Sequence, residues 1–437
     1  MLKLSSRYYY LRHENEIQRF LSNNSNWIHI INKENSFKNF TNSKENLFLI
    51  DLNSNLSKQI QTIEDQKFDL IIITDIFEVT DDIYGLLNSL NKLLTNNGKI
   101  LINSINTKWN FFLLFFEFFK IKKISRPRSY IHLKKIYSIS ESSGFEMVKS
   151  FTRQIFPFRL FGIGNLLNTI LEIIFFKFNI GINNYLLLSK TNKEQKVYSK
   201  TIIVPAKNEE LNLEPIINRI PLFESDYEIL LVCAKSSDNT VETAYEIQQK
   251  YKNLPIKIIE QKTKGKGPGV LEAIEVSNFE IITILDSDLS VDPETLNEFF
   301  EIIENGRADF VNGTRFVYKM EEGAMRKLNS IGNLFFQYII SIGISTRLTD
   351  SLCGTKVFKK DLINQMSEWK STLFIKDPFG DFDFIFSAAF SGQKILEYPV
   401  HYKSRTYGQT QISRFRDGWK LLFYFISSFV KFNSSNK

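Results

Sequence analysis

Short apolar runs alternate with amphipathic stretches along most of this chain. Residues 67–106 read as a buried strand, an acidic turn, an amphipathic helix, an Asn-Gly turn and a second buried strand. Residues 201–220 read as a strand, a turn and a helix, and residues 228–248 repeat that pattern. Strands that alternate with helices are typical of sheets covered by helices on both faces. The pattern therefore predicts an α/β protein built from doubly wound domains.

The chain divides near residue 195. Residues 185–190 (YLLLSK) read as a final buried strand, a polar stretch follows, and a new strand begins over residues 201–205 (TIIVP). A length of 437 residues fits two or three domains. We expect a first domain over residues 1–192, a linker over 193–199, a second domain over 200–420, and an apolar C-terminal helix with its tail over 421–437.

Composition and charge narrow the class of partner. Hydrophobic residues make up 43% of the chain and charged residues 24%, so the chain can form a core. The net charge of +7 favours anionic partners such as nucleotides, phosphates or lipid head groups. The lysines are scattered rather than clustered, so no nucleic-acid partner is expected. The two cysteines, Cys233 and Cys353, cannot form a disulfide framework, which favours a reducing compartment.

The sequence has neither a signal-peptide pattern at its start nor a run of the roughly 18–20 apolar residues that a spanning helix needs. We therefore expect a cytoplasmic protein, either free or on the cytoplasmic face of a membrane. Residues 419–432 (WKLLFYFISSFVKF) are apolar but too short to span. This segment either lies in a membrane interface or forms a last core helix or a dimer contact, and the sequence does not indicate the oligomeric state.

The segment with the clearest chemistry is EIITILDSDLSVDP, residues 280–293. A buried strand ends there in Asp286, Ser287 and Asp288. Residues i and i+2 of an extended chain project from the same face, so the two carboxylates converge at the carboxyl end of a strand. A divalent cation would remove their repulsion, and Mg²⁺ or Mn²⁺ is commonly held by one or two carboxylates together with substrate phosphates. The plainer interpretation is a turn with two solvent-facing aspartates.

Neighbouring strand ends carry further candidates. Pro205, Asn208 and Glu209 lie in the turn after the strand at 201–205, where open α/β sheets bind ligands. Asp238 precedes a helix and would either cap it or face a nucleotide. The loop KTKGKGPG contains Lys264, Gly265 and Lys266, which offer close backbone approach and positive charge to a diphosphate, although such loops are often only solvated.

The segments VPAKNEE, SSDNT, GKG, LDSDL, NGTRF, CGTK, FGDFDF and YPVHYKSRTYG occur in this order over residues 200–420. Together they resemble a family-2 glycosyltransferase of GT-A fold, in particular the dolichyl-phosphate mannosyltransferase-like subgroup. The resemblance implies inverting transfer of a sugar from a nucleotide-diphosphate donor, with Mg or Mn on the diphosphate. The implied acceptor is a lipid phosphate or a growing surface glycan.

The same resemblance implies roles for individual residues. Metal binding falls on Asp286, Asp288 and Ser290, and donor binding on the turn residues above together with Ser287. Arg315 and Arg405 are candidates to neutralise a diphosphate or an acceptor phosphate, with Lys403 as a further option. The general base falls on Asp381 or Asp383, and Asp288 completes the predicted catalytic set. Charge stabilisation of a helix N-terminus would also explain the first two acids.

One departure concerns the nucleobase. Many relatives have an acid immediately before the Ser-x-Asp segment, whereas this chain has Cys233, Ala234 and Lys235 there. The identity of the nucleotide therefore stays open. The departure also keeps a second hypothesis open, in which both domains are non-catalytic remnants that act as a scaffold.

Residues 7–190 resemble a class I methyltransferase that uses S-adenosylmethionine, on the pattern of residues 67–106 and 130–148. The first strand, WIHII, runs into NKENSFKNF without a glycine, so side chains stand where the cofactor would approach the backbone. S-adenosylmethionine is therefore not expected to bind, although Asp51 would suit a ribose, and Asp75 and Glu78 follow the next strand. We expect a degenerate, structural or acceptor-docking domain; a working methyltransferase beside the glycosyltransferase is the alternative.

Overall fold

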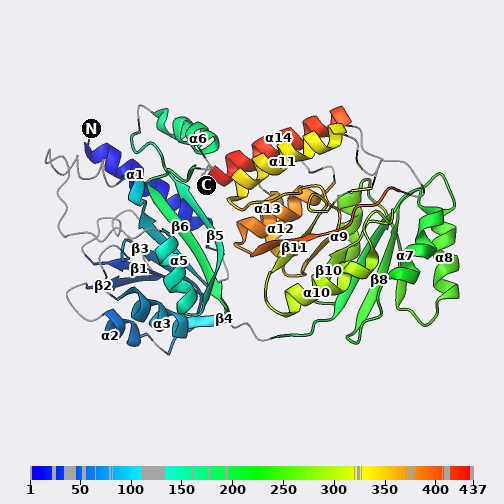
Figure 1. The fold of residues 1–437 in the computed structure, drawn as a ribbon, viewed down its shortest axis with the longest axis horizontal. Coiled ribbons are helices and arrows are strands. Elements are labelled where there is room, and N and C mark those ends of the chain that lie inside the picture. Colours follow the sequence, from blue (N-terminus) through cyan, green and yellow to red (C-terminus); the bar gives the residue numbers. More distant parts are fainter. Residues whose placement is uncertain are drawn as a thin grey trace. The chain divides into compact units, whose positions relative to one another are not determined.

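The computed structural model describes residues 2–21, 26–33, 46–51, 56–63, 65–77, 80, 82–109, 133–159, 162–175, 178–191, 195–318, 320–321, 325, 327–371, 373, 377, 379–405, 407 and 414–433. The chain forms two compact units, with the division between Lys193 and Glu194 (Figure 1). Unit 1 comprises Met1–Lys193 with Ser435–Lys437, and unit 2 comprises Glu194–Ser434. Each contains its own mixed sheet, as the alternation of strands and helices predicts.

Unit 1 is built on a six-stranded sheet in the order β2-β1-β3-β4-β6-β5. Strands β1 to β4 run parallel, and β6 runs antiparallel between β4 and β5. The elements are α1 (Leu2–Gln18), β1 (Trp27–Asn32), β2 (Leu47–Ile50), α2 (Leu56–Gln61), β3 (Phe68–Thr74), α3 (Ile83–Leu93), β4 (Leu94–Ile105), α5 (Leu133–Ser142), β5 (Phe145–Arg153), α6 (Gly164–Ile174) and β6 (Asn183–Lys190).

Helices cover both faces of this sheet. Apolar side chains of α2, α3 and α5 pack on one face, and those of α1 pack on the other. The expected Asn-Gly turn at residues 97–98 lies instead inside β4, where the pairing with β3 shifts register between Phe68 and Leu70. The extra residues are thus accommodated as an irregularity in the ladder rather than as a turn between elements.

Unit 2 is built on a seven-stranded sheet in the order β13-β11-β12-β10-β7-β8-β9. Its elements are β7 (Lys200–Ala206), α7 (Glu210–Arg219), β8 (Tyr227–Cys233), α8 (Thr240–Lys250), β9 (Ile256–Glu260), α9 (Lys266–Val276), β10 (Ile281–Ile284), α10 (Leu296–Glu304), β11 (Phe310–Thr314), α11 (Lys327–Ile344), β12 (Lys356–Lys359), α12 (Leu362–Ser371), α13 (Asp381–Phe390), β13 (Ile395–Pro399) and α14 (Arg414–Asn433). Figure 1 shows α11 and α14 side by side.

The direction of the strands positions the site. Strand β12 is antiparallel to both β10 and β11, whereas the other pairings in this sheet are parallel. The carboxyl ends of β7, β8, β10, β11 and β13 therefore meet at one edge of the sheet, together with the amino end of β12. The motifs at residues 205–209, 236–240, 286–290, 312–315, 353–356 and 400–405 all follow or precede those ends.

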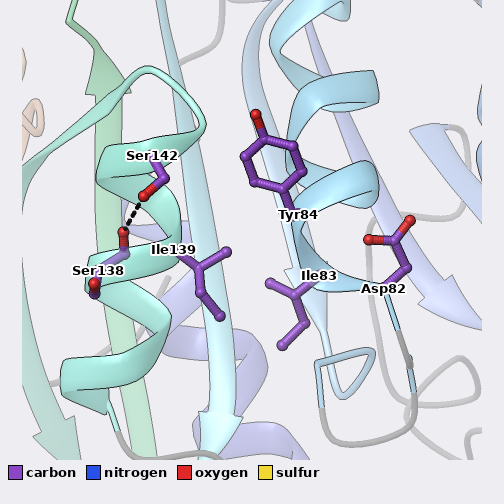
Figure 2. A pocket seen from close by; sticks show the side chains of 6 residues that line it. All are labelled: Asp82, Ile83, Tyr84, Ser138, Ile139 and Ser142. Atoms are coloured by element: carbon purple, nitrogen blue, oxygen red, sulfur yellow. Dashed lines mark hydrogen bonds between the residues drawn. The ribbon is translucent and has the colours of Figure 1, made fainter.

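No helix in the described part of the chain is both long and apolar enough to cross a membrane. The segment 419–432, expected to be helical, lies within α14. In unit 1 a hollow of about 360 Å³ opens between α3 and α5 (Figure 2). Its one carboxylate, that of Asp82, accepts a hydrogen bond from the backbone N–H of Gly85 and so caps α3. This hollow brings together none of the candidate catalytic groups.

Candidate active site of unit 2

Asp286 and Asp288 lie just beyond the four buried residues of β10. Oδ1 of Asp286 lies 2.6 Å from Nζ of Lys266, and Oδ2 of Asp288 lies 2.8 Å from Nη2 of Arg405. The Lys266 ammonium also interacts electrostatically with Asp288, and the Arg405 guanidinium with Asp286. The two predicted acids and two predicted cations therefore form one cluster, which we call the Asp286–Asp288 cluster.

Burial and charge oppose each other at Asp286. Burial alone would raise its pKa, but the ammonium of Lys266, with smaller contributions from Lys356 and Arg405, holds the pKa below its usual value. The carboxylate rests on the backbone of Gly354, where a Cβ would collide with it. Glycine at this position is thus required by the close approach of Asp286.

Lys356 is a buried cation at the first position of β12. Its Nζ lies 2.7 Å from Oδ1 of Asp381 and also donates a hydrogen bond to the carbonyl oxygen of Cys353. The side chain of Lys356 is fully buried, and that of Asp381 is 9% exposed. Lys356 also lowers the pKa of Asp286, so it interacts with both a candidate base and a candidate metal ligand.

Asp383 has a different environment from Asp381. Its Oδ1 accepts a hydrogen bond of 2.5 Å from the hydroxyl of Tyr424 in α14, and its Oδ2 lies 3.0 Å from Nζ of Lys370. Asp381, in contrast, interacts with Lys266 in the Asp286–Asp288 cluster. The structure therefore brings only one of the two predicted bases to the cluster.

Asp377 supports the start of α13. Its Oδ2 accepts hydrogen bonds from the backbone N–H groups of Phe382 at 2.7 Å and Asp383 at 3.1 Å. Burial, with the negative charge of Asp383 next in effect, raises the pKa of Asp377 to about 7. A carboxyl group at the N-terminus of a helix in this way satisfies backbone donors that have no partner within the helix.

The turns after β7 and β8 are joined by hydrogen bonds. The backbone N–H of Asn208 donates to Oγ of Ser236 at 3.1 Å, and Oδ1 of Asn208 accepts from the backbone N–H of Ser237 at 2.8 Å. Asn208 has a φ of 56°, a left-handed conformation that asparagine tolerates better than most residues. Ser287 ties this region to the acids, because its hydroxyl donates to the carbonyl oxygen of Pro205 at 2.9 Å.

Asp238 caps the start of α8. Its Oδ1 accepts from the backbone N–H of Thr240 at 3.2 Å, and its Oδ2 accepts from that of Glu210 at 3.3 Å. The contacts of this carboxylate thus join the first residues of α7 and α8. The hydroxyl of Tyr407 approaches Oδ2 at 3.4 Å and brings the segment after β13 to the same turn.

Glu209 is a buried carboxyl group beside the cluster. Burial, together with the negative charges of Asp288 and Asp286, raises its pKa to about 7, although the amide of Asn212 donates to it at 2.6 Å. Burial is the larger cause of this shift, and the two aspartates of the cluster add to it.

The glycine-and-lysine loop ends at the cluster. Gly265 has a φ of 109°, which favours glycine, and α9 begins at the next residue, Lys266. Lys264 is exposed at the surface of this loop. The loop therefore delivers Lys266 to Asp286, while Lys264 faces solvent.

Arg315 and Lys403 are held by other acids. Nε and Nη2 of Arg315 lie 2.6 Å and 2.8 Å from the two carboxylate oxygens of the fully buried Asp350. This bidentate pair uses the fork of the guanidinium, so Arg315 supports the end of β11 rather than the Asp286–Asp288 cluster. Lys403 lies 2.7 Å from Oδ1 of Asp292, which Arg219 also contacts.

The donor set fits a divalent cation through two carboxylates. Asp286 and Asp288 supply hard oxygen ligands of the kind that Mg²⁺ and Mn²⁺ prefer. Ser290 donates from its hydroxyl to Oδ1 of Asp288 at 2.6 Å, so it orients that carboxylate. Within the described residues, no three His, Cys, Asp or Glu side chains form a metal-binding group.

The sequence placed Gly354 and Asp377 in motifs of this region without giving either a role, and it did not single out Lys356 or Tyr424. Gly354 and Lys356 lie in the CGTK segment. This segment was part of the family resemblance, but its sequence does not indicate which acids the two residues contact. Tyr424 lies in α14, 41 residues from Asp383, so no local pattern indicates that contact.

In unit 1 the structure describes fewer of the candidate residues. The backbone N–H and carbonyl of Asp51 bond to the side chain of Gln59 at 2.9 Å and 2.8 Å. Asp75 follows β3 with a φ of 53°. Three parts of unit 1 lie outside the described residues: Glu78, the segment NKENSFKNF beyond Lys33, and residues 110–119. Gly408 of unit 2 also lies outside them.

Unit 2 is an α/β domain with charged side chains gathered at one edge of its sheet, and comparison with known proteins shows which family this part of the chain matches. Residues 201–366 match the family described as Glycosyl transferase family 2. Unit 2 therefore contains a region that matches a family 2 glycosyltransferase domain. The matched region includes the Asp286–Asp288 pair and Lys356, and it ends before Asp381 and Arg405.

Curated relatives share this domain. A dolichol-phosphate mannosyltransferase of Pyrococcus furiosus is 29% identical over 220 residues, which cover 48% of this chain and 58% of that protein. A dolichyl-phosphate hexose transferase of Haloferax volcanii is 25% identical over 217 residues, covering 50% of this chain and 88% of that protein. A dodecaprenyl-phosphate galacturonate synthase of Rhizobium johnstonii is 24% identical over 181 residues, which cover 40% of this chain and 52% of that protein. The chain thus spans little more than half the length of two of these relatives.

Among solved structures, glucosyl-3-phosphoglycerate synthase of Mycobacterium tuberculosis with Mn²⁺, UDP and phosphoglyceric acid is similar at a TM-score of 0.39. The identity is 13%, and the match covers 55% of this chain and 80% of that chain. The S. aureus TarS 1–349 structure gives a TM-score of 0.35 and 17% identity, and the match covers 55% of this chain and 67% of that chain. Similarity at this level does not establish a ligand or a mechanism.

Proposed function

We propose that unit 2 transfers a sugar, with inversion, from a nucleotide-diphosphate sugar to a polyprenyl phosphate or a surface glycan. The observation that carries this proposal is the Asp286–Asp288 cluster, which combines two carboxylates and two cations at the carboxyl ends of the strands. The names of the curated relatives, which describe polyprenyl-phosphate sugar transferases, support this class of acceptor.

Asp286 and Asp288 would hold Mg²⁺ or Mn²⁺. Such an ion would stabilise the negative charge of the departing nucleoside diphosphate. Lys266 and Arg405, which lie on the two aspartates here, would then be available to the oxygens of the diphosphate. The turns at Pro205, Asn208 and Glu209 would bind the nucleoside side of the donor.

Asp381 is the residue to which we assign the general base. With a hydroxyl acceptor its carboxylate takes the proton as the oxygen attacks the anomeric carbon. A phosphate acceptor is already ionised, so Asp381 would then only orient it. The Lys356 ammonium, 2.7 Å away, fixes the carboxylate for either purpose.

The pair of helices α11 and α14 offers a surface for the acceptor's membrane. Six large apolar side chains on these helices are at least 47% exposed: Ile331, Leu334, Phe335, Trp419, Phe423 and Ile426. Amphipathic helices with such a face lie in the membrane interface. We propose that this α11–α14 surface contacts the lipid in which a polyprenyl-phosphate acceptor resides.

The central test is Asp288→Asn, which keeps the size of the side chain but removes its charge. Donor turnover, measured as release of nucleoside diphosphate, should fall by at least about a hundredfold. The matched control is Asp309→Asn, at the start of β11 and remote from the cluster, which should retain turnover. The role of the cluster would be refuted if the Asp288→Asn variant, assayed with a divalent cation, were as active as the wild type. A wild-type protein that turns over no nucleotide sugar would favour the scaffold hypothesis.

For unit 1 we propose a methyltransferase-like fold without cofactor-dependent catalysis. The order of its sheet, with an antiparallel strand inserted next to the edge strand, supports the fold. Calorimetric titration of the full chain with S-adenosylmethionine is the test. Micromolar binding of S-adenosylmethionine would contradict the proposal that unit 1 uses no cofactor, and it would favour a bifunctional enzyme.

A further inference from the structure

Helix α6 of unit 1 is amphipathic with its polar side turned inward. Its buried residues are Gly164, Asn168 and Glu172, which recur at every fourth position. Residues four apart lie on one face of a helix. A helix that covers a soluble domain usually buries its apolar stripe and exposes its polar side. Helix α6 has the reverse arrangement.

The buried polar side is fully engaged with its own unit. Asn168 bonds through its amide to the backbone N–H and carbonyl of Phe156, both at 2.7 Å. Oε1 of Glu172 accepts from Arg12 at 3.1 Å and from the backbone N–H of Gln154 at 2.7 Å. These contacts fix the rotation of the helix about its axis, so its apolar side is held outward.

The outward side is a stripe of large apolar residues. Ile163 is 55% exposed, Leu166 60%, Ile170 43% and Ile174 57%. Phe178, just beyond the helix, is 62% exposed and Phe158, just before it, is 40% exposed. We call these six residues the α6 stripe. Contiguous exposed apolar patches of this kind mark interaction sites.

Charge around the stripe favours an anionic partner. In residues 154–159, 162–175 and 178–182 the single carboxylate is that of Glu172, which is buried against Arg12. Exposed basic side chains lie near both ends: Arg159 precedes the helix, and Lys108 donates to the carbonyl oxygen of Phe178. An apolar stripe flanked by cations suits a bilayer whose surface carries anionic head groups.

The size of the stripe argues against a second copy of the chain as its partner. Eleven helical residues span about 16 Å, and a helix is about 10 Å wide. A stable protein–protein interface buries roughly 800 Å² on each partner. A single short stripe falls well below that area, whereas insertion of one amphipathic helix into a lipid interface needs no second surface.

We propose that the α6 stripe is a membrane-docking surface of unit 1 that inserts into the interface of an anionic bilayer. The stripe acts independently of the α11–α14 surface, because it belongs to the other compact unit and carries its own flanking cations. Unit 1 thereby gains a function that requires no bound cofactor.

The test uses the full chain and vesicles of phosphatidylcholine with 30% phosphatidylglycerol. A background variant, Trp419→Glu with Phe423→Glu, removes the proposed contribution of α14. In that background Leu166→Glu should lower the vesicle-bound fraction at least tenfold. Leu211→Glu is the matched control, since Leu211 is a leucine of similar exposure, 63%, on α7 of unit 2. It should leave binding unchanged.

Two further measurements separate lipid from other partners. Ile170→Trp should give fluorescence that brominated lipids quench, because the indole then lies at the acyl boundary. Binding should weaken on vesicles of phosphatidylcholine alone. The proposal is overturned if the background variant does not bind vesicles, if Leu166→Glu binds as well as the background, or if Leu166→Glu only converts a dimer to a monomer in sedimentation equilibrium.

Discussion

Gly267 and Gly380 touch through their backbones. A Cβ placed on Gly267 would lie 2.9 Å from the Cα of Gly380, and a Cβ on Gly380 would lie 2.8 Å from the Cα of Gly267. Gly267 is in the first turn of α9, next to Lys266, and Gly380 directly precedes Asp381. This contact joins the lysine that meets Asp286 to the proposed general base. The separation between Lys266 and Asp381 is thus set by two residues without side chains.

The contact predicts a strong effect of a single methyl group. Gly267→Ala should lower both turnover and thermal stability, because the backbone at Gly380 must move, and loss of stability by about 1–3 kcal/mol is typical of overpacking. Gly332→Ala is the control. Gly332 lies within α11 and a Cβ there meets nothing within 4 Å, so alanine should stabilise the helix by about 0.5–1 kcal/mol. Thermal unfolding and initial rates of both variants check this, and equal behaviour of the two would contradict it.

Substitutions at Lys356 and Asp381 should have non-additive effects on stability and turnover. Lys356→Met leaves a buried carboxylate without its ammonium, and removing one partner of a buried ion pair costs about 3–5 kcal/mol. Asp381→Asn should lower turnover sharply. The double variant should be more stable than Lys356→Met alone, and its turnover should not fall below that of Asp381→Asn.

A double-mutant cycle on unfolding free energy and turnover tests this directly. Additive losses of turnover would show that Lys356 does not act through Asp381. Lys359→Met, three residues further along β12, is a control at which no comparable coupling to Asp381 is expected.

Asp383 and Tyr424 are expected to matter for stability more than for chemistry. Tyr424→Phe removes the hydroxyl that donates to Asp383 at 2.5 Å, so the unfolding free energy should fall by about 1–3 kcal/mol. Turnover of the folded fraction should stay near that of the wild type. Asp381→Asn should instead lower the turnover of the folded fraction sharply, and it should also lose stability because the buried ammonium of Lys356 is left without its partner. If Tyr424→Phe instead abolished turnover at unchanged stability, Asp383 would be the better candidate for the base.

Two pairs of aspartates with the same spacing show how much of the site could be predicted from the sequence. Asp286 and Asp288 follow a strand, and the alternation of an extended chain predicts that they project from one face. In the structure they lie in the turn after β10 and both interact with Lys266 and Arg405. Asp381 and Asp383 have the same spacing but begin a helix, where two positions differ by about 200° around the axis. They therefore face different surroundings, and the choice between them needed the positions of α9, α12 and α14.

The same reasoning applies to the sheets. Alternating strands and helices predicted two α/β units, and both sheets are present. The antiparallel insertion of β12 depends on pairing with β10 and β11, which are distant in sequence, so its four residues gave no sign of direction. Lys356 reaches the site only because of that direction. The inward polar side of α6 was likewise hidden, since the periodicity of a helix does not indicate which side meets the protein.

Unit 1 should be sensitive to acid because two of its histidines are buried. Burial lowers the pKa of His13 to about 4 and that of His29 to about 3, against an ordinary value of 6.5. The unfolded chain therefore binds more protons than the folded one below about pH 6.5. Stability is complete above that pH and is lost as the pH falls towards 4 and then 3, by up to about 1.4 kcal/mol per pH unit for each histidine.

Hydrogen exchange of the full chain, corrected for intrinsic rates, measures this unit by unit. Between pH 6.5 and 4.5 the peptides that contain β1 and β3 should lose protection faster than the peptide that contains β7. His29 contacts the hydroxyl of Thr74 through Nε2 at 2.8 Å, and His29→Gln preserves a polar partner without the titration. The variant should therefore have a shallower pH dependence in β1 and β3. An unchanged slope would mean that groups other than His29 determine the acid stability of unit 1.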